Sequence, residues 1–110
     1  MKFKAARVIL FTRQIDRMTE FYRDVMGLKV VTSEPGWREL DAGGITIGLH
    51  AGRPSPGKKG PKIAFLAKDV AKAREALVAR GARFGKIAGS KLQLCNGKDP
   101  DGNPIQLSSR

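Results

Sequence analysis

Four residues occupy matched positions of a degenerate internal repeat, and their types limit the chemistry that the chain can perform. They are Arg7, Gly48, Lys62 and Gln106. The two cations suit a carboxylate or phosphate ligand. Only Gln106 offers an oxygen that could coordinate a metal ion, and a lone amide oxygen is a weak ligand. The repeat that relates them pairs residues 7–11 with 62–66, and residues 44–49 with 102–107.

Each half of the chain reads as a strand, a helix and three further strands. In the first half, apolar residues at helical spacing predict one helix over 15–26, and Gly27 suits a left-handed cap at its end. The predicted strands cover residues 5–11, 28–32, 37–42 and 45–50, and the last two form a hairpin joined at Gly43 and Gly44.

The second half repeats the pattern after residues 51–60, AGRPSPGKKG, which read as a linker. Asp69 is a plausible N-cap for a helix that ends at Gly81. Residues 99–103 read as a tight structural turn, because they lack the spaced oxygen ligands of a calcium loop. The predicted strands cover residues 62–67, 83–87, 91–95 and 104–108.

Composition indicates one compact soluble domain of 110 residues. There is no apolar run long enough for a membrane span and no secretory signal, and the single Cys95 fits a reducing cytoplasm, so we expect a cytoplasmic protein without membrane partners. The net charge of +11 favours anionic partners. The basic residues are scattered and aromatic residues are few, so nucleic acid is possible but not favoured.

Three segments resemble the vicinal oxygen chelate superfamily, which includes glyoxalase I, extradiol dioxygenases and bleomycin-resistance proteins. They are residues 20–28 (EFYRDVMGL), residues 62–65 followed by Asp69 and Val70, and residues 99–107 (DPDGNPIQL). The resemblance spans almost the whole chain. It implies an α+β fold of one domain over residues 1–110, in which two βαβββ modules, 1–50 and 61–110, flank the 51–60 linker. Such modules curl into a half-open cup that is usually completed by dimerisation.

The resemblance also locates the superfamily's metal ligands, one on the first strand and one on the fourth strand of each module. These positions fall on Arg7, Gly48, Lys62 and Gln106. Cations repel a divalent ion and glycine has no donor, so we predict that the metal site is lost and that no cofactor is bound.

Strand alternation predicts which side chains face the implied cup. If Arg7 and Lys62 face it and approach to about 4 Å, their repulsion costs on the order of 4 kcal/mol at an effective dielectric of about 20. A bound anion could bridge them, Lys62 could lose its proton and act catalytically, or the side chains could swing to solvent or to an acid such as Glu39 or Asp41. The predicted ligand-binding residues are Arg7, Lys62, Gln106, His50, Phe11 and Trp37.

We therefore predict a metal-independent small-molecule binding protein of the glyoxalase/bleomycin-resistance type, which forms a homodimer and binds an anionic or polar-aromatic ligand. Enzymatic activity stays open. One alternative is a glyoxalase-related lyase or isomerase that uses Arg7 or Lys62 in place of a metal. A second alternative is a nucleic-acid-binding module driven by charge.

Overall fold

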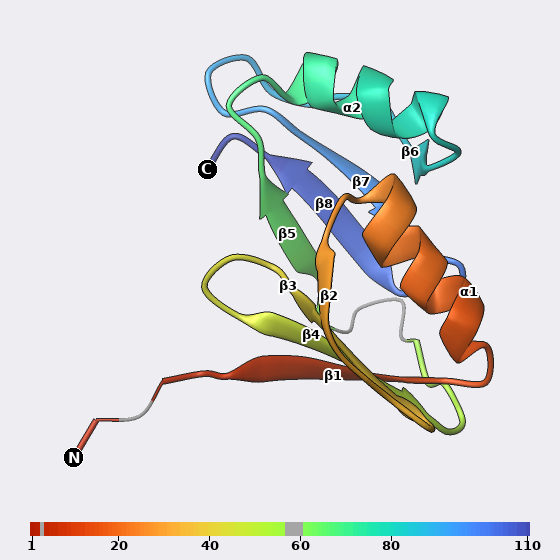
Figure 1. The fold of residues 1–110 in the computed structure, drawn as a ribbon. Helices are drawn as coiled ribbons and strands as arrows, with labels where there is room; N and C mark the ends of the chain where they lie inside the picture. The colour runs from red at the N-terminus through yellow and green to blue at the C-terminus, as the bar shows by residue number, and fades with distance from the viewer. Residues whose placement is uncertain (3, 57–60) are drawn as a thin grey trace. The chain divides into compact units, whose positions relative to one another are not determined.

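A computed structural model describes residues 1–2, 4–56 and 61–110, and it divides into two units, Met1–Ser55 and Pro56–Arg110. We call them the first and the second module. Each contains a strand, a helical segment and three further strands, which confirms the predicted α+β fold with two βαβββ modules (Figure 1). Residues 57–60 of the predicted linker lie outside the described residues.

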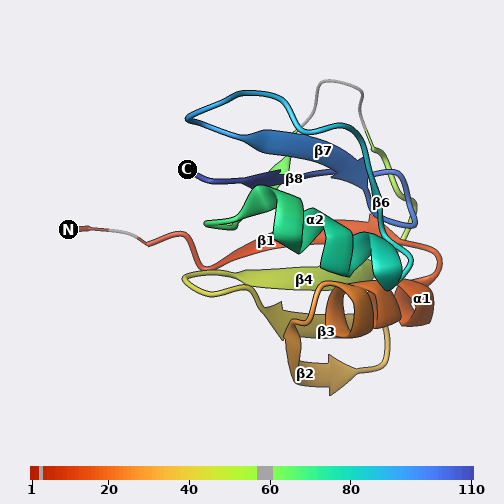
Figure 2. The ribbon, with the colours of Figure 1, turned by 90° about the horizontal axis from the view of Figure 1, so that it is seen from above.

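The first module is a four-stranded mixed sheet with one face covered by a helix. Its strands are β1 (Arg7–Thr12), β2 (Lys29–Glu34), β3 (Trp37–Asp41) and β4 (Thr46–Ala51), in the order β1-β4-β3-β2. The strand β1 runs parallel to β4, and the other neighbours are antiparallel. The predicted hairpin at Gly43 and Gly44 is confirmed, because Ala42 N–H donates to Ile45 O across it at 2.9 Å. The helix α1 (Ile15–Glu20) lies beside β3 and β4 (Figure 2).

The second module repeats this topology with β5 (Ile63–Leu66), β6 (Arg83–Phe84), β7 (Leu94–Lys98) and β8 (Pro104–Ser108), in the order β5-β8-β7-β6. The helix α2 (Val70–Ala79) packs on β6, β7 and β8 (Figure 1). Asp69 caps it as predicted, since its Oδ1 accepts from Lys72 N–H at 3.0 Å. Among the described residues, no helix is long and apolar enough to cross a bilayer.

Alternation along the strands separates a helix-covered core face from an opposite face. Leu40, Ile47 and Leu49 are fully or almost fully buried in the first module, as are Ile105 and Leu107 in the second. On β1 and β5, the side chains that point away from the helix are exposed, as the alternation of the sequence predicts. They include Ile9 at 45%, Phe11 at 50% and Leu66 at 73% relative exposure. The face opposite the helix therefore carries exposed apolar side chains in both modules.

The first helix is not the single α-helix that its spacing predicts. After Glu20 it widens into a π-helical turn, Phe21–Val25, in which Met26 N–H donates to Phe21 O at 3.0 Å. The wider turn keeps two consecutive aromatic residues buried, and the rings of Phe21 and Tyr22 meet edge to face at 5.1 Å. The end of the helix follows the prediction, because Gly27 adopts a φ of 79°.

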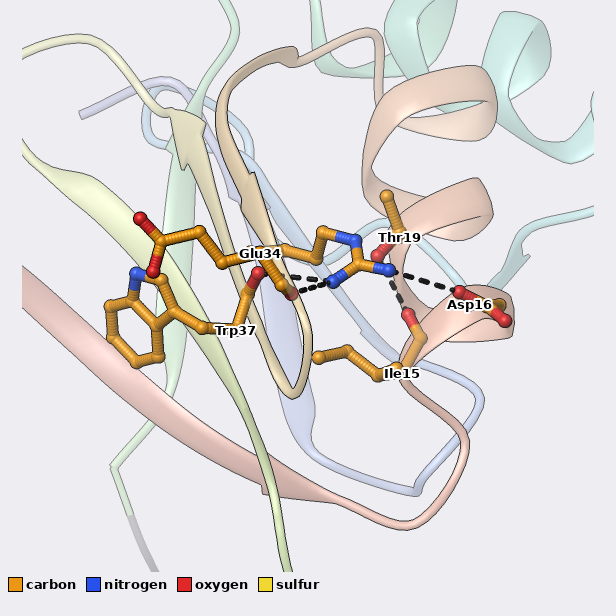
Figure 3. A network of polar contacts seen from close by, with 6 residues as sticks. Ile15, Asp16, Thr19, Glu34 and Trp37 are labelled. Atoms are coloured by element: carbon orange, nitrogen blue, oxygen red, sulfur yellow. Dashed lines mark hydrogen bonds and ion pairs between the residues drawn. The ribbon is translucent and has the colours of Figure 1, made fainter.

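Arg38 connects the first turn of α1 to the β2–β3 hairpin (Figure 3). Its guanidinium donates to the backbone oxygens of Glu34 and Trp37, the latter at 3.0 Å, and lies 3.4 Å from Asp16 Oδ1. In the same turn the Thr19 hydroxyl donates to Ile15 O at 2.6 Å. The helix is thus anchored to β3 by polar contacts as well as by its buried apolar side chains.

Two predicted strands of the second module are wrong in extent. The first, predicted over 83–87, ends at Phe84, and the second, predicted over 91–95, is β7 (Leu94–Lys98). The lack of a Cβ on Gly97 explains this register, because a Cβ there would lie 2.3 Å from Arg83 O and 2.8 Å from the Phe84 ring. The close approach of β6 to β7 requires glycine at this point.

The turn at 99–103 is confirmed as structural. Asp99 is 5% exposed, and its Oδ1 accepts from the backbone N–H groups of Asp101 and Asn103 at 2.9 Å each. Its Oδ2 accepts from Asn103 Nδ2 at 2.8 Å, and Gly102 adopts a φ of 87°. One buried carboxylate therefore holds the loop that leads into β8.

Candidate ligand-binding site

Strand register confirms that the four matched residues are equivalent in the two modules. In the β1–β4 pair, Ile9 lies opposite Gly48, and in the β5–β8 pair, Ala64 lies opposite Gln106. Arg7 precedes Ile9 by two residues on β1, and Lys62, the residue before β5, precedes Ala64 by two. Strand alternation therefore directs Arg7 to the same side as Ile9 and Lys62 to the same side as Ala64. Each module therefore places one cation and one fourth-strand residue on the face opposite its helix.

In the first module the indole of Trp37 occupies the space above Gly48. A Cβ atom on Gly48 would lie 2.6 Å from Trp37 Cη2, closer than real Cβ contacts, and 3.1 Å from Cζ2. The ring is held there because Trp37 Nε1 donates to Glu39 Oε1 at 2.9 Å. A side chain at position 48 would therefore have to displace the indole.

The same placement of Trp37 builds a row of three rings. Its indole meets the His50 imidazole edge to face at 5.8 Å, and the His50 ring lies 5.1 Å from the Phe11 ring. Register explains the row, since His50 is the β4 partner of Phe11 on one side and of Trp37 on the other. His50 Nδ1 lies 2.8 Å from Ala51 O, a contact that fixes the ring beside the other two.

Arg7 lies at the other end of this face, beside Glu39. Its Nε is 3.9 Å from Glu39 Oε2, and the two side chains are 44% and 19% exposed. Glu39 thus uses one oxygen for Trp37 and the other for Arg7. A half-exposed pair of this kind adds at most about 1 kcal/mol to stability, but it partly neutralises the cation.

In the second module a carboxamide takes the place of that carboxylate. Asn96 Oδ1 accepts from Lys62 Nζ at 3.0 Å and from Gln106 Nε2 at 3.0 Å. Asn96 is the β7 partner of Gln106, as Glu39 on β3 is the partner of Gly48. In each module, therefore, the cation contacts a residue of the neighbouring strand β3 or β7: Arg7 contacts Glu39, the partner of Gly48, and Lys62 contacts Asn96, the partner of Gln106.

The residue types at the four matched positions are poor metal ligands. Arg7 and Lys62 are cations, Gly48 has no donor, and its space holds an indole. Gln106 retains one amide oxygen, since its nitrogen donates to Asn96. Within residues 1–2, 4–56 and 61–110, no three His, Cys, Asp or Glu residues lie close enough to hold an ion together. This donor set does not fit a divalent cation.

The structure thus links Arg7, Trp37, His50 and Phe11 within the first module, and Lys62 and Gln106 within the second. Two residues of these networks are absent from the predicted site, Glu39 and Asn96. Glu39 was foreseen only as an acid to which a cation could turn. Asn96 lies outside the predicted site because the predicted strand ends at residue 95, whereas β7 continues to Lys98. A search for residues opposite the matched positions would have found both.

Comparison with known proteins identifies the family. The family model described as the Glyoxalase/Bleomycin resistance protein/Dioxygenase superfamily matches residues 4–107. The chain belongs to this superfamily. None of the curated proteins matches the chain in sequence.

Solved structures of other superfamily proteins share the fold across the whole chain. A lactoylglutathione lyase from Agrobacterium tumefaciens is 20% identical, with a TM-score of 0.77 over 97% of this chain and 93% of that one. A glyoxalase family protein from Bacillus anthracis is 15% identical, with a TM-score of 0.80 over 98% and 95%. A glyoxalase/bleomycin resistance protein/dioxygenase from Nocardioides is 18% identical, with a TM-score of 0.78 over 98% and 83%. At these identities the likeness shows the fold alone.

Proposed function

We propose that this superfamily member is a metal-independent small-molecule binding protein whose ligand is anionic or polar-aromatic. The observation that carries the proposal is the indole of Trp37 above Gly48. It fills the space that a coordinating side chain would need, and it turns the first module's exposed face into an aromatic surface. Rings beside a few charged groups are the usual lining of a small-molecule site.

The polar groups on these faces favour a ligand with a planar body and a charged or polar edge. Phe11 and Trp37 offer ring surface for stacking, which does not depend on the ligand's charge. Arg7 and Glu39, which pair with each other at 3.9 Å, give the ring surface of the first module a polar edge. Such groups fix the orientation of a ligand more than they determine its affinity.

Metal independence is tested by loading. Purified protein equilibrated with zinc, nickel, iron or manganese and then dialysed should retain far less than one ion per chain by elemental analysis. Gly48→Glu, which supplies a carboxylate at the fourth-strand position, serves as a comparison for the same measurement. One tightly held ion per wild-type chain, released by Gln106→Leu, would contradict the proposal.

Ligand binding is tested with three matched aromatic probes, benzoate, phenyl phosphate and uncharged benzamide. Trp37 is the only tryptophan, so its fluorescence reports on the first module without labelling. We expect saturable binding by calorimetry, together with a fluorescence change that Trp37→Leu removes. If none of the probes, and no wider set of small aromatic acids, binds saturably, small-molecule binding is the wrong function.

We also propose that the protein is a homodimer. Exposed Ile9, Phe11 and Leu66 leave apolar strand surface that a second copy could cover. Light scattering should then report about twice 12.0 kDa. A monomer at high micromolar concentration would exclude this assembly.

A further inference from the structure

The two modules differ in the charge of the residue that contacts the cation. Glu39 is the cross-strand partner of Gly48 in the first module, and Asn96 is the partner of Gln106 at the equivalent position of the second. Glu39 carries a negative charge beside Arg7, at 3.9 Å. Asn96 satisfies one hydrogen bond of Lys62 at 3.0 Å but carries no charge. Arg7 is therefore already paired with an anion, whereas Lys62 keeps its full positive charge.

The lysine also fixes the orientation of both amides. An ammonium group can only donate hydrogen bonds, so the Asn96 atom that faces it must be Oδ1. Gln106 approaches the same oxygen and must present Nε2 to it, at 3.0 Å. The Asn96 amide nitrogen therefore points away from this contact with two N–H groups, and Lys62 Nζ keeps two more. Among the described residues these N–H groups have no acceptor.

Charge distribution along the chain reinforces this asymmetry. Residues 56–110 contain twelve Lys and Arg against four Asp and Glu, a net charge of +8, whereas residues 1–55 contain nine against six, a net charge of +3. Two of the four acids in the second module have structural tasks, since Asp69 caps α2 and Asp99 holds a turn. The second module thus carries the larger net positive charge, which favours anionic partners.

We propose that Lys62 and Asn96, with Gln106 as a positioning residue, form an oxyanion subsite of the second module, and that it holds the carboxylate of a small organic acid. Two donors on neighbouring residues, one of them charged, match the two oxygens of a carboxylate. Arg7 does not take part. The inference rests on the proposed small-molecule binding function and assigns the ligand's acidic group to one module.

The test exchanges the two third-strand residues. Asn96→Asp gives the second module the charge arrangement of the first, and Glu39→Gln removes that arrangement from the first. Calorimetric titrations at constant ionic strength compare benzoate with benzamide, which has the same ring and no charge. Wild type should bind benzoate about tenfold or more tightly than benzamide, as expected for a charge-assisted hydrogen bond. Asn96→Asp and Lys62→Met should abolish this preference.

Glu39→Gln and Arg7→Ala are the matched controls in the first module, and both should keep the preference for benzoate. Circular dichroism and thermal melting show whether each variant folds. If Asn96→Asp does not fold, Lys62→Met alone tests the inference. A preference that survives in both Asn96→Asp and Lys62→Met, or one that Arg7→Ala abolishes, overturns the inference. In that outcome benzoate and benzamide still bind, so the proposed function stands.

A phosphate and a nucleic acid are distinguished in the same experiment. Phenyl phosphate that binds more tightly than benzoate and depends on Lys62 would retain the subsite but overturn its assignment to a carboxylate. Duplex DNA that binds with a steep salt dependence, while neither benzoate nor phenyl phosphate is preferred to benzamide, would overturn the subsite and assign the charge of the second module to nucleic acid.

Discussion

Trp37 and Gly48 are neighbours across β3 and β4, and the indole of one lies where the side chain of the other would be. A Cβ on Gly48 would be 2.6 Å from Trp37 Cη2. The same indole donates to Glu39 and lies against His50. The lack of a side chain on Gly48 therefore has two effects. It leaves this position without an atom that could coordinate a metal, and it leaves space for the Trp37 indole to lie on the sheet.

Gly48→Ala should destabilise the first module, because the added methyl must push the indole away from Glu39. We expect a loss of about 1–3 kcal/mol in denaturant unfolding, typical of overpacking, and a change in tryptophan emission. Gly44→Ala is the control, since a Cβ there meets nothing within 4 Å and Gly44 has no positive φ. An unchanged midpoint and unchanged emission in Gly48→Ala would mean that the ring does not lie over this residue.

Asp69→Ala should weaken the start of α2. Asp69 Oδ1 accepts from Lys72 N–H at 3.0 Å, and loss of such a cap costs about 0.5–2 kcal/mol. Asp69→Asn retains an acceptor oxygen and should stay close to wild type. The two variants are compared by urea unfolding, and equal losses in both would show that the charge of Asp69, not its cap, matters.

Asp24 should titrate with a pKa below the ordinary value of an aspartate. Arg23 donates to both carboxylate oxygens, at 2.7 and 2.8 Å, and this pairing lowers the pKa of Asp24. Since the folded pKa lies below the unfolded one, the pair contributes to stability above the unfolded pKa and the contribution is lost as pH falls through the folded pKa. Carboxyl chemical shifts measured by NMR should show a higher Asp24 pKa in Arg23→Gln. Identical titrations in both proteins would contradict the pairing.

Cys95 should be unreactive in the native protein. Burial raises the pKa of its thiol, and the residue is fully buried on β7. A thiol reagent at pH 8 should modify it on the order of a thousandfold more slowly than in urea-unfolded protein, because reaction needs an opening that costs several kcal/mol. Comparable rates in the two states would mean that β7 opens readily.

Local patterns were enough to predict the modules and their caps. Alternation separates Ile9 and Phe11 from the core, and the predicted cap at Asp69 and hairpin at Gly43 are both present. These features depend on neighbours in the chain, and the sequence therefore contains their causes. The matched positions of Arg7 and Lys62 follow from the repeat and agree with the strand register.

The contacts made by the candidate site residues were decided by tertiary structure. Asn96 contacts Lys62 from β7, which covers Leu94–Lys98, whereas the apolar residues predict a strand over 91–95. Gly97 allows β6 to approach β7, because a Cβ there would lie 2.3 Å from Arg83 O. The π-helical turn Phe21–Val25 likewise contains two consecutive buried aromatic residues, Phe21 and Tyr22. Neither the extent of β7 nor the π-helical turn could be predicted from the pattern of residues close in the chain.

The sequence by itself determined the fold, the two cations and the lack of a coordinating set at the matched positions. Only the tertiary structure decided that one cation faces a carboxylate and the other an amide. The sequence gives the residue types, but whether the charge of Arg7 or Lys62 is compensated depends on which side chain lies beside it on the neighbouring strand. That pairing is set by register and by the space that Gly48 and Gly97 leave open.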